Sequence, residues 1–368
     1  MGAVNTAFEG FAAPASPPRV AGDRAIVYPH ARTPLQDAVM SDTTPGLVTV
    51  FGGSGFVGTQ VVRALARQGW RVKVAVRRPN LAQDLRVNGD VGQIQPVRCD
   101  ITRPADVEAA LKGAEAAVNL VGLLFEGPGG KFAKSHVEGA RTIAQTCAAT
   151  GIARFVHISA IGADANSEAA YGRTKGEAEQ AVLAALPTAT ILRPSIVFGA
   201  GDGFLNRFAS MATMSPALPL IGGGKTRFQP VYVGDVAEAV ARAIVSPEAW
   251  GQTYELGGPA VWSFKDILTY ILRETNRSRM LAPIPVFAAA TLGRVAGLTA
   301  MVGIAPVLTR DQVLMLKTDN VVSPGALGLA DLGIEATGLE AIAPSYLWRY
   351  RRGGQFADNP RDPEVLPA

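Results

Sequence analysis

Residues 48–58, VTVFGGSGFVG, decide how this chain folds. An apolar run from Leu47 to Phe51 ends abruptly in a cluster of glycines, and apolar residues at helical spacing follow, among them Val61 and Leu65. This order predicts a strand, a tight glycine turn and a helix. Such a turn presents its backbone N–H groups, together with the positive end of the helix, to a pyrophosphate.

Three of the glycines have separate roles in a turn of this kind. Gly52 allows the sharp bend, Gly55 lets a phosphate approach the backbone, and Gly58 lets the helix pack close to the strand. The spacing is G-x-x-G-x-x-G, and a glycine loop can also simply close a turn between a strand and a helix. The strand before the turn and the helix after it favour a dinucleotide site. The predicted contacts are Gly52, Gly53, Ser54, Gly55, Phe56, Val57 and Gly58.

The composition is that of a globular chain on the apolar side. Of 368 residues, 48% are hydrophobic and 18% are charged. The mean hydropathy of +0.18 indicates an apolar, association-prone surface or a location beside a membrane. The net charge of +4 comes without a dense Lys/Arg run, which argues against nucleic acid as a partner. Cys99 and Cys147 lie in a predicted strand and a predicted helix, so we expect buried thiols, no disulfide and no metal site.

The longest apolar stretch is too interrupted to span a membrane. It runs from Leu281 to Leu308 and contains Pro283, Arg294 and Pro306. Because it is too apolar for open solvent, two interpretations stay open: an interfacial or partner-facing segment, and an ordinary buried helix.

From Leu47 onward strands and helices alternate, which predicts a parallel sheet covered on both faces. The expected fold class is α/β, a Rossmann-type doubly wound parallel sheet with a smaller C-terminal α/β region. Residues 219–225 are expected to form a glycine loop. The predicted strands are 47–51, 71–76, 95–99, 116–121, 154–159, 188–197, 228–233 and 253–256, and the predicted later helices are 104–111, 136–150, 169–186, 204–214, 234–245, 264–275, 285–298 and 309–317.

Composition divides the chain into four parts. Residues 1–45 are rich in Ala, Pro and Arg without periodicity, so we expect a disordered extension, with Met40 as an alternative start of translation. Residues 46–198 form the predicted nucleotide-binding Rossmann domain. Residues 199–348 form a smaller variable region, facing substrate or partner and interleaved with the sheet. Residues 349–368, basic and then Pro-rich, are a predicted flexible tail.

The residues after the second predicted strand indicate which of the two pyridine dinucleotides, NAD(H) or NADP(H), the site prefers. An NAD(H) site usually places an acidic residue there, on the ribose hydroxyls, whereas this chain has Arg77 and Arg78. Two guanidinium groups without a carboxylate suit a 2′-phosphate, so we expect NADP(H) over NAD(H); the alternative is a solvated arginine pair. Asp100, followed by Ile101, is placed to meet the adenine amino group or else to cap the helix that begins at Pro104. The residues expected to line the cofactor after the fourth strand are Asn119, Val121 and Gly122.

A second constellation combines Tyr171 and Lys175, in YGRTK, with Ser159 at the end of the fifth predicted strand. Residues four apart share one face of a helix. We expect the ammonium group to lower the pKa of the tyrosine from about 10, so that the phenol exchanges a proton with a substrate carbonyl that Ser159 also holds. His136 and His157 lie in apolar elements and are interpreted as core or cofactor-adjacent histidines.

These motifs resemble a known family. GGSGFVG, ISA, YGRTK, LRPSIVFG and RFQPVYVGDVA are similar to the atypical extended short-chain dehydrogenase/reductases. More narrowly, FLNRFASM, QPVYVGDVA, LTRDQV and DLGIEAT resemble the NADPH-binding accessory subunits of respiratory complex I, over about Leu47 to Thr337. The resemblance implies that Arg193, Pro194 and Ser195 flank the nicotinamide. It also implies that Lys175 binds the nicotinamide ribose, so the Ser-Tyr-Lys set can persist for binding without turnover.

The resemblance implies a tightly held NADPH with a mainly structural role, in an accessory subunit of NADH:ubiquinone oxidoreductase rather than in an independent catalyst. The implied partners are other complex I subunits and the membrane surface, without a transmembrane helix. The implied location is peripheral, on the cytoplasmic side of a bacterial inner membrane, with the mitochondrial matrix side and the soluble cytoplasm as alternatives. The alternative function is a free NADP-dependent reductase or epimerase of the extended family, with Tyr171 as acid or base.

Overall fold

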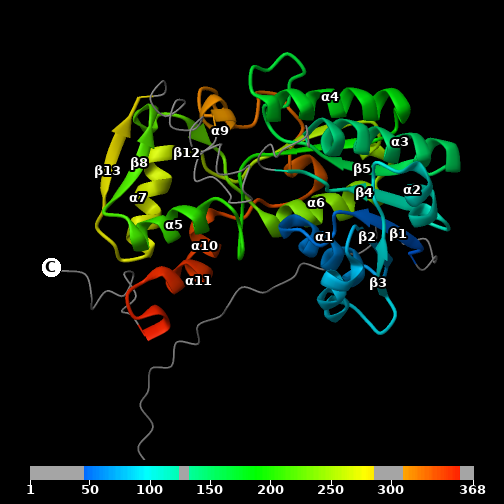
Figure 1. Ribbon diagram of the computed structural model, residues 1–368, viewed down its shortest axis with the longest axis horizontal. Helices are drawn as coiled ribbons and strands as arrows, with labels where there is room; N and C mark the ends of the chain where they lie inside the picture. Colours follow the sequence, from blue (N-terminus) through cyan, green and yellow to red (C-terminus); the bar gives the residue numbers. More distant parts are fainter. Residues whose placement is uncertain (1–44, 124–131, 286–309, 357–368) are drawn as a thin grey trace, which may run out of the picture. The chain divides into compact units, whose positions relative to one another are not determined.

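The computed structural model describes residues 45–123, 132–285 and 310–356 (Figure 1). All the described residues belong to the second of the chain's two units, residues 44–368. The predicted disordered extension up to residue 44 lies outside the described residues, as do segments 124–131, 286–309 and 357–368. The predicted helix 285–298 falls almost entirely in one of these segments.

A seven-stranded parallel sheet forms the centre of the second unit. Its strand order is β3-β2-β1-β4-β5-β6-β11, so the order reverses between β1 and β4. This confirms the Rossmann-type doubly wound α/β fold, in which ligands bind beyond the carboxyl ends of the strands at the reversal. The strands are β1 (Leu47–Phe51), β2 (Arg71–Val76), β3 (Ile94–Arg98), β4 (Ala116–Asn119), β5 (Arg154–Ile158), β6 (Thr190–Pro194) and β11 (Thr253–Leu256).

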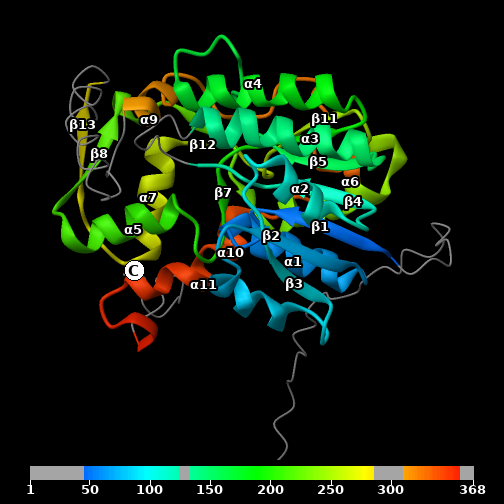
Figure 2. The ribbon, with the colours of Figure 1, turned by 45° about the vertical axis from the view of Figure 1, so that its right-hand side comes forward.

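Helices cover both faces of this sheet (Figures 1 and 2). Two of them, α1 and α6, pack together over one face, and α2, α3 and α4 cover the other. The hydrophobic core is accordingly split into two layers by the sheet. The bounds are α1 (Phe56–Arg67), α2 (Pro104–Leu111), α3 (Gly139–Thr150), α4 (Ala170–Ala185) and α6 (Val233–Val245).

The opening strand and helix form for the reasons that their patterns suggest. β1 is apolar along its length because both of its faces are covered: Val48 and Val50 belong to the layer of α1 and α6, and Phe51 to the opposite layer. α1 buries Val61 and Leu65 at the spacing of one helix face. The glycine turn is therefore fixed between two well-packed elements.

A smaller region has a third core of its own, which includes a cluster of aromatic rings. Phe204, Phe208 and Phe264 lie within 5.2–6.3 Å of one another, centroid to centroid. Ser263 caps α7 as predicted, in a capping box with Asp266. The elements are β7 (Val197–Phe198), α5 (Leu205–Met214), β8 (Ala217–Ile221), β9 (Arg227–Phe228), β10 (Val231–Tyr232), β12 (Trp262–Ser263), α7 (Phe264–Glu274), β13 (Met280–Ile284), α9 (Arg310–Met315), α10 (Leu339–Ile342) and α11 (Pro344–Leu347).

Several element predictions were wrong in detail. The expected glycine loop 219–225 begins as strand: β8 pairs in parallel with β13, so apolar residues on both segments gain main-chain partners. The start of the long apolar stretch, Leu281–Ile284, is therefore strand rather than helix. The expected strands 188–197 and 228–233 are each split in two. The expected helix 136–150 begins with a π-helical turn, Ala133–Glu138.

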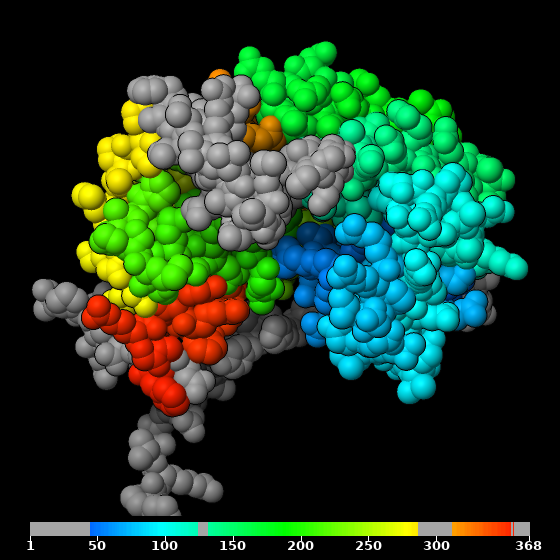
Figure 3. All heavy atoms as spheres, in the orientation of Figure 1, coloured from blue at the N-terminus to red at the C-terminus, as the bar shows by residue number. Residues whose placement is uncertain are grey.

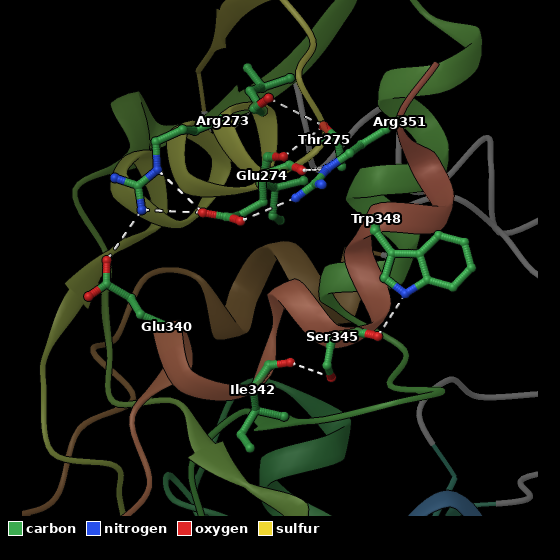
Figure 4. A network of polar contacts seen from close by, with 10 residues as sticks. Arg273, Glu274, Thr275, Glu340, Ile342, Ser345, Trp348 and Arg351 are labelled. Atoms are coloured by element: carbon green, nitrogen blue, oxygen red, sulfur yellow. Dashed lines mark hydrogen bonds and ion pairs between the residues drawn. The ribbon is translucent and has the colours of Figure 1, made fainter. Parts of the chain in front are cut away.

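The segment around Tyr350 and Arg351 is held near the end of α7 (Figure 4). The Arg351 guanidinium donates a 2.7 Å hydrogen bond to the carbonyl oxygen of Glu274 and lies 3.9 Å from the same residue's fully buried carboxylate. Arg277 donates to the carbonyl oxygen of Tyr350. This differs from the prediction of a flexible tail starting at residue 349, because Arg351 joins Arg273, 3.5 Å away, in pairing with the buried carboxylate of Glu274.

Candidate dinucleotide site

The glycine turn has the geometry that its sequence suggests. Gly52 has φ +78°, in the left-handed region that favours glycine. A Cβ at Gly58 would collide with the carbonyl oxygen of Gly52, which confirms that this position needs glycine for close packing. At Gly55 the nearest neighbour of such a Cβ is the same oxygen, at an ordinary 3.5 Å, so this side of the turn is open.

The N-terminus of α1 is available to an anion. Its N-cap residue, Gly55, provides no side-chain cap, and among the described residues no acidic side chain lies in the first turn. Ser54 and Gly55 are exposed. On the face shown in Figure 3, the dark blue surface of this segment lies between the cyan surface of the following strands and helices and the green surface around α5. Free N–H groups at a helix start, with no competing carboxylate, suit a pyrophosphate.

Two arginines extend this anion site at the end of β2. Arg77 and Arg78 are exposed, and within the described ranges neither side chain has a hydrogen bond or an ion pair. The neighbouring carboxylate of Asp100 has its pKa lowered, chiefly by hydrogen bonds from the hydroxyl and N–H of Thr102 and to a smaller degree by the charges of Arg103 and Arg77. The arginines are therefore free to meet a phosphate.

Asp100 closes its own turn rather than capping a helix. Its Oδ1 accepts the two bonds from Thr102, at 3.1 and 2.8 Å, and Arg103 occupies the N-cap position of α2. The alternative interpretation as a helix cap was therefore wrong, and the adenine contact stays a prediction. The side chain of Ile101 is half-buried and packs against Gly139, where a Cβ would collide with it.

Asn119 is fully buried and braces the turn after β4. Its Oδ1 accepts the N–H of Val121 at 3.1 Å, so its amide nitrogen donates to Nδ1 of His157, also at 3.1 Å. These bonds occupy the side chain of Asn119, and of the two residues that follow the turn Val121 is half-buried and Gly122 is exposed. A Cβ at Gly122 would lie 3.4 Å from the Lys175 ammonium nitrogen.

The structure brings Ser159 and Lys175 to the carboxyl end of β5. Nζ of Lys175 donates a 3.0 Å hydrogen bond to the carbonyl oxygen of Ile158, and burial lowers the pKa of this lysine to about 8. Ser159 is 3% exposed, and its hydroxyl oxygen has no hydrogen-bond partner in the described part of the chain. A buried, unpartnered hydroxyl costs free energy unless a ligand satisfies it, so this group fits a carbonyl or ribose contact.

Tyr171 is in a different electrostatic state from the one expected. Burial, together with the nearby carboxylate of Asp311, raises the pKa of its phenol to about 12. The prediction that Lys175 would lower this pKa was wrong, because the lysine amine is engaged by the Ile158 carbonyl and Asp311 places a negative charge close by. Tyr171 therefore remains a neutral phenol.

The rings of Phe132 and His136 flank Tyr171. Phe132 stacks on His136 at 4.9 Å between centroids, and both rings meet Tyr171 edge-on at 6.0 and 5.8 Å. Nε2 of His136 accepts the N–H of Leu123, so Nδ1 carries the proton and donates to Thr174. Burial lowers the pKa of His136 to about 3, so the ring is neutral. The cofactor-adjacent interpretation of this histidine fits its position, whereas Phe132 had no signal in the sequence.

The residues at the end of β6 and directly after it have structural partners. Arg193 forms a bidentate ion pair with Glu179, at 2.9 and 2.6 Å, and lies 3.6 Å from Glu255. The hydroxyl of Ser195 lies 2.8 and 2.7 Å from the carbonyl and side-chain oxygens of Asn320, and Pro194 is buried. The guanidinium of Arg193 is thus committed to the fold, and any cofactor contact of this segment is left to its backbone.

Two further features concern ligands and membranes. Among the described residues no group of three or more His, Cys, Asp or Glu side chains is arranged to hold a metal ion. In the same residues, no helix has the length and apolarity needed to cross a bilayer. Cys99 and Cys147 are buried free thiols, as predicted.

The sequence of this chain is similar to a known protein family and to individual known proteins. Residues 48–257 match the NAD dependent epimerase/dehydratase family. The chain is 35% identical to NADH dehydrogenase (ubiquinone) 1 alpha subcomplex subunit 9, mitochondrial, of Arabidopsis thaliana, over 84% of this chain and 79% of that protein. It is 34% identical to ceramide reductase of Caulobacter vibrioides, over 54% of this chain and 61% of that protein.

A solved structure shares the fold. NADPH-dependent quinone oxidoreductase QOR2 from Escherichia coli, complexed with NADPH, superposes with a TM-score of 0.65 at 20% identity, over 82% of this chain and 99% of that one. At this identity the likeness shows the fold alone.

Proposed function

Because this chain belongs to the NAD dependent epimerase/dehydratase family, we propose that it holds NADP(H) as a resident cofactor and serves as an accessory subunit of NADH:ubiquinone oxidoreductase. The protein is then peripheral, bound to the other complex I subunits beside the membrane, on the cytoplasmic side in a bacterium or on the matrix side in a mitochondrion. Ubiquinone reduction itself is the work of the whole complex. This chain contributes a stable, cofactor-filled module.

The extent of the likeness carries the subunit assignment. Similarity to the Arabidopsis subunit covers 84% of this chain, which is far more than the nucleotide-binding part, whereas similarity to the Caulobacter reductase covers 54%. A free dehydrogenase and a subunit both need the Rossmann half. A subunit also has to keep the surface that contacts its neighbours, which supports the assignment made from the longer match.

The residues of the site suit NADP(H), because groups at the carboxyl ends of neighbouring strands match successive parts of the dinucleotide. The uncapped start of α1 takes the pyrophosphate, and the unpartnered guanidinium groups of Arg77 and Arg78 take the 2′-phosphate. Lys175 and the unpartnered hydroxyl of Ser159 take the nicotinamide ribose end. NADPH, when bound, supplies a hydride. The protein residues then hold its position and exclude water.

The state of Tyr171 supports a mainly structural cofactor. A proton-transfer group works best when its pKa lies near the working pH, and this phenol has a pKa of about 12. A neutral phenol donates a hydrogen bond well but gives up its proton reluctantly. Ser159, Tyr171 and Lys175 therefore serve the proposed function as cofactor-binding residues rather than as an active set.

Affinity capture from detergent-solubilised membranes of the source organism tests the subunit assignment. The expected result is co-purification of other complex I subunits with the tagged chain, and NADPH fluorescence in the captured material. A capture that recovers the chain without any complex I subunit contradicts the proposal. The wild-type chain captured from the soluble fraction is the matched control.

A second candidate is a free NADP-dependent reductase or epimerase, for which two observations speak. The structure brings Ser159 and Lys175 together at one strand end, and the chain resembles ceramide reductase over half its length. The test is NADPH oxidation with ketones, quinones and nucleotide sugars, using wild type and Tyr171→Phe. Turnover that Tyr171→Phe abolishes would favour this candidate over the structural role.

A further inference from the structure

The helix that carries Tyr171 and Lys175 is capped from far away in the sequence. α4 begins at Ala170 after Ala169, whose methyl side chain has no capping group. The N–H groups of Ala170 and Tyr171 instead donate to the two carboxylate oxygens of Asp311, at 2.6 and 2.9 Å. One side chain, 140 residues later, thus satisfies two of the orphan donors of this helix and places a negative charge at its positive end.

Asp311 is the first residue of a segment, residues 311–320, which we name the strap. The strap is fastened to the loop that joins Ser159 to Tyr171. The side-chain amide of Asn320 donates to the carbonyl oxygen of Ile161 at 3.1 Å, and Lys317 lies 3.7 Å from the carboxylate of Glu168. The methyl end of Met315 lies 3.7 Å from where a Cβ of Gly162 would be.

The same strap is fastened to the smaller region on its other side. Asp319 pairs with Arg227 at 2.8 Å, and Thr226 donates its hydroxyl hydrogen to the carbonyl oxygen of Leu316. Val313 is fully buried and packs with Ile221 of β8. Figures 1 and 2 show α9, the helical start of the strap, beside the N-terminal part of α4, in agreement with their contacts.

We propose that Asp311 is a positioning residue which, through the strap, holds Tyr171 against the nicotinamide end of the bound dinucleotide and slows cofactor release. This inference rests on the proposed function, because it assumes that NADP(H) occupies the site. Release of the nicotinamide end requires the first turn of α4 and the loop 159–169 to move. The strap ties both of them to the smaller region, so the dinucleotide leaves only when these ties open.

The test uses the full-length chain with Asp311→Ala and Asp311→Asn. The control is Asp266→Asn, which removes a capping carboxylate from α7, away from the site. Two quantities are measured: amide hydrogen exchange in the peptide covering residues 160–174, and the rate of NADPH release after mixing with excess NADP⁺. We expect Asp311→Ala to speed both by about tenfold, the effect of losing a helix cap and its hydrogen bonds, and Asp266→Asn to change each less than about twofold.

A third arm separates positioning from a general loss of structure. The 2′-phosphate analogue of ADP lacks both the nicotinamide and its ribose, so it binds only through the pyrophosphate and adenosine end. Its release is expected to change less than about twofold in Asp311→Ala, whereas a merely loosened protein would release both ligands faster. Equal acceleration of the two ligands, or unchanged exchange and unchanged NADPH release, overturns the proposal.

Failure of the proposed function is recognised separately. If wild type binds no NADPH, the cofactor assignment is wrong, and hydrogen exchange at residues 160–174 still decides whether Asp311 fastens the strap. If Asp311→Ala does not fold, Asp311→Asn carries the comparison, because it keeps one of the two acceptor oxygens and loses the charge.

Discussion

Arg193 on β6 binds Glu179 on α4 through two parallel hydrogen bonds, from Nε at 2.9 Å and from Nη2 at 2.6 Å. The Glu179 side chain is 7% exposed and that of Arg193 is 29% exposed. Such a bidentate pair fixes geometry as well as charge. It locks the helix that carries Lys175 onto the sheet, one turn after that lysine.

Removing one partner of this pair leaves the other charge poorly solvated. We expect Glu179→Ala to lower the free energy of unfolding by about 2–3 kcal/mol, measured by urea denaturation. The matched control is Glu238→Ala, which breaks the more exposed pair with Arg242 on α6 and is expected to cost less than about 0.5 kcal/mol. Equal costs for the two variants would contradict the structural role assigned to Arg193.

The glycine turn gives a prediction that separates folding from binding. Gly58→Ala is expected to destabilise the chain by about 2 kcal/mol, because the added methyl collides with the backbone of Gly52. Gly55→Ala has room for its methyl and is expected to keep wild-type stability, within about 0.5 kcal/mol, while binding NADPH more weakly. Thermal unfolding and fluorescence titration measure the two effects. Gly55→Ala with unchanged affinity would show that no phosphate approaches this residue.

The buried histidines predict how stability depends on pH. Burial lowers the pKa of both His136 and His157 to about 3, from an ordinary value of 6.5. Between these values the unfolded chain binds a proton that the folded chain does not, so the free energy of unfolding falls as the pH is lowered. Each histidine is expected to contribute about 2 kcal/mol of this loss between pH 7.5 and pH 5.

The check is urea denaturation of wild type, His136→Asn and His157→Asn at pH 7.5, 6.5 and 5. Each variant is expected to lose stability less steeply than wild type over this range, since one proton-linked group is gone. A slope equal to that of wild type in both variants would mean that these rings titrate normally in the folded protein.

The sequence predicts most of what depends on local pattern. The apolar run, the glycines and the alternation of strands and helices led to the observed sheet because each of these signals acts over a few residues. The same holds for Ser263, whose capping of α7 depends on a residue three positions away. Pairing of β8 with β13 was missed, because main-chain partners sixty residues apart leave no local signature.

The electrostatics of the candidate site depend on contacts that the sequence does not reveal. Asp311 meets Tyr171 across 140 residues, and this distant carboxylate, with burial, reverses the expected shift of the tyrosine pKa. Arg193 was assigned to the cofactor because its segment resembles a family motif, whereas its partner Glu179 lies on another element. Exposure is likewise a property of the folded chain. Only the structure shows that Arg77 and Arg78 are both accessible and, among the described residues, unpartnered, so that they are available to a phosphate.

The choice of nucleotide by Arg77 and Arg78 tests the account most directly. Isothermal titration of wild type and of the Arg77→Ala/Arg78→Ala variant with NADPH and with NADH compares four affinities under one set of conditions. We expect wild type to bind NADPH at least about tenfold more tightly than NADH, and the variant to lose this preference while its NADH affinity stays within about twofold. Equal affinity of wild type for the two nucleotides, or a preference that survives the double substitution, would contradict the account.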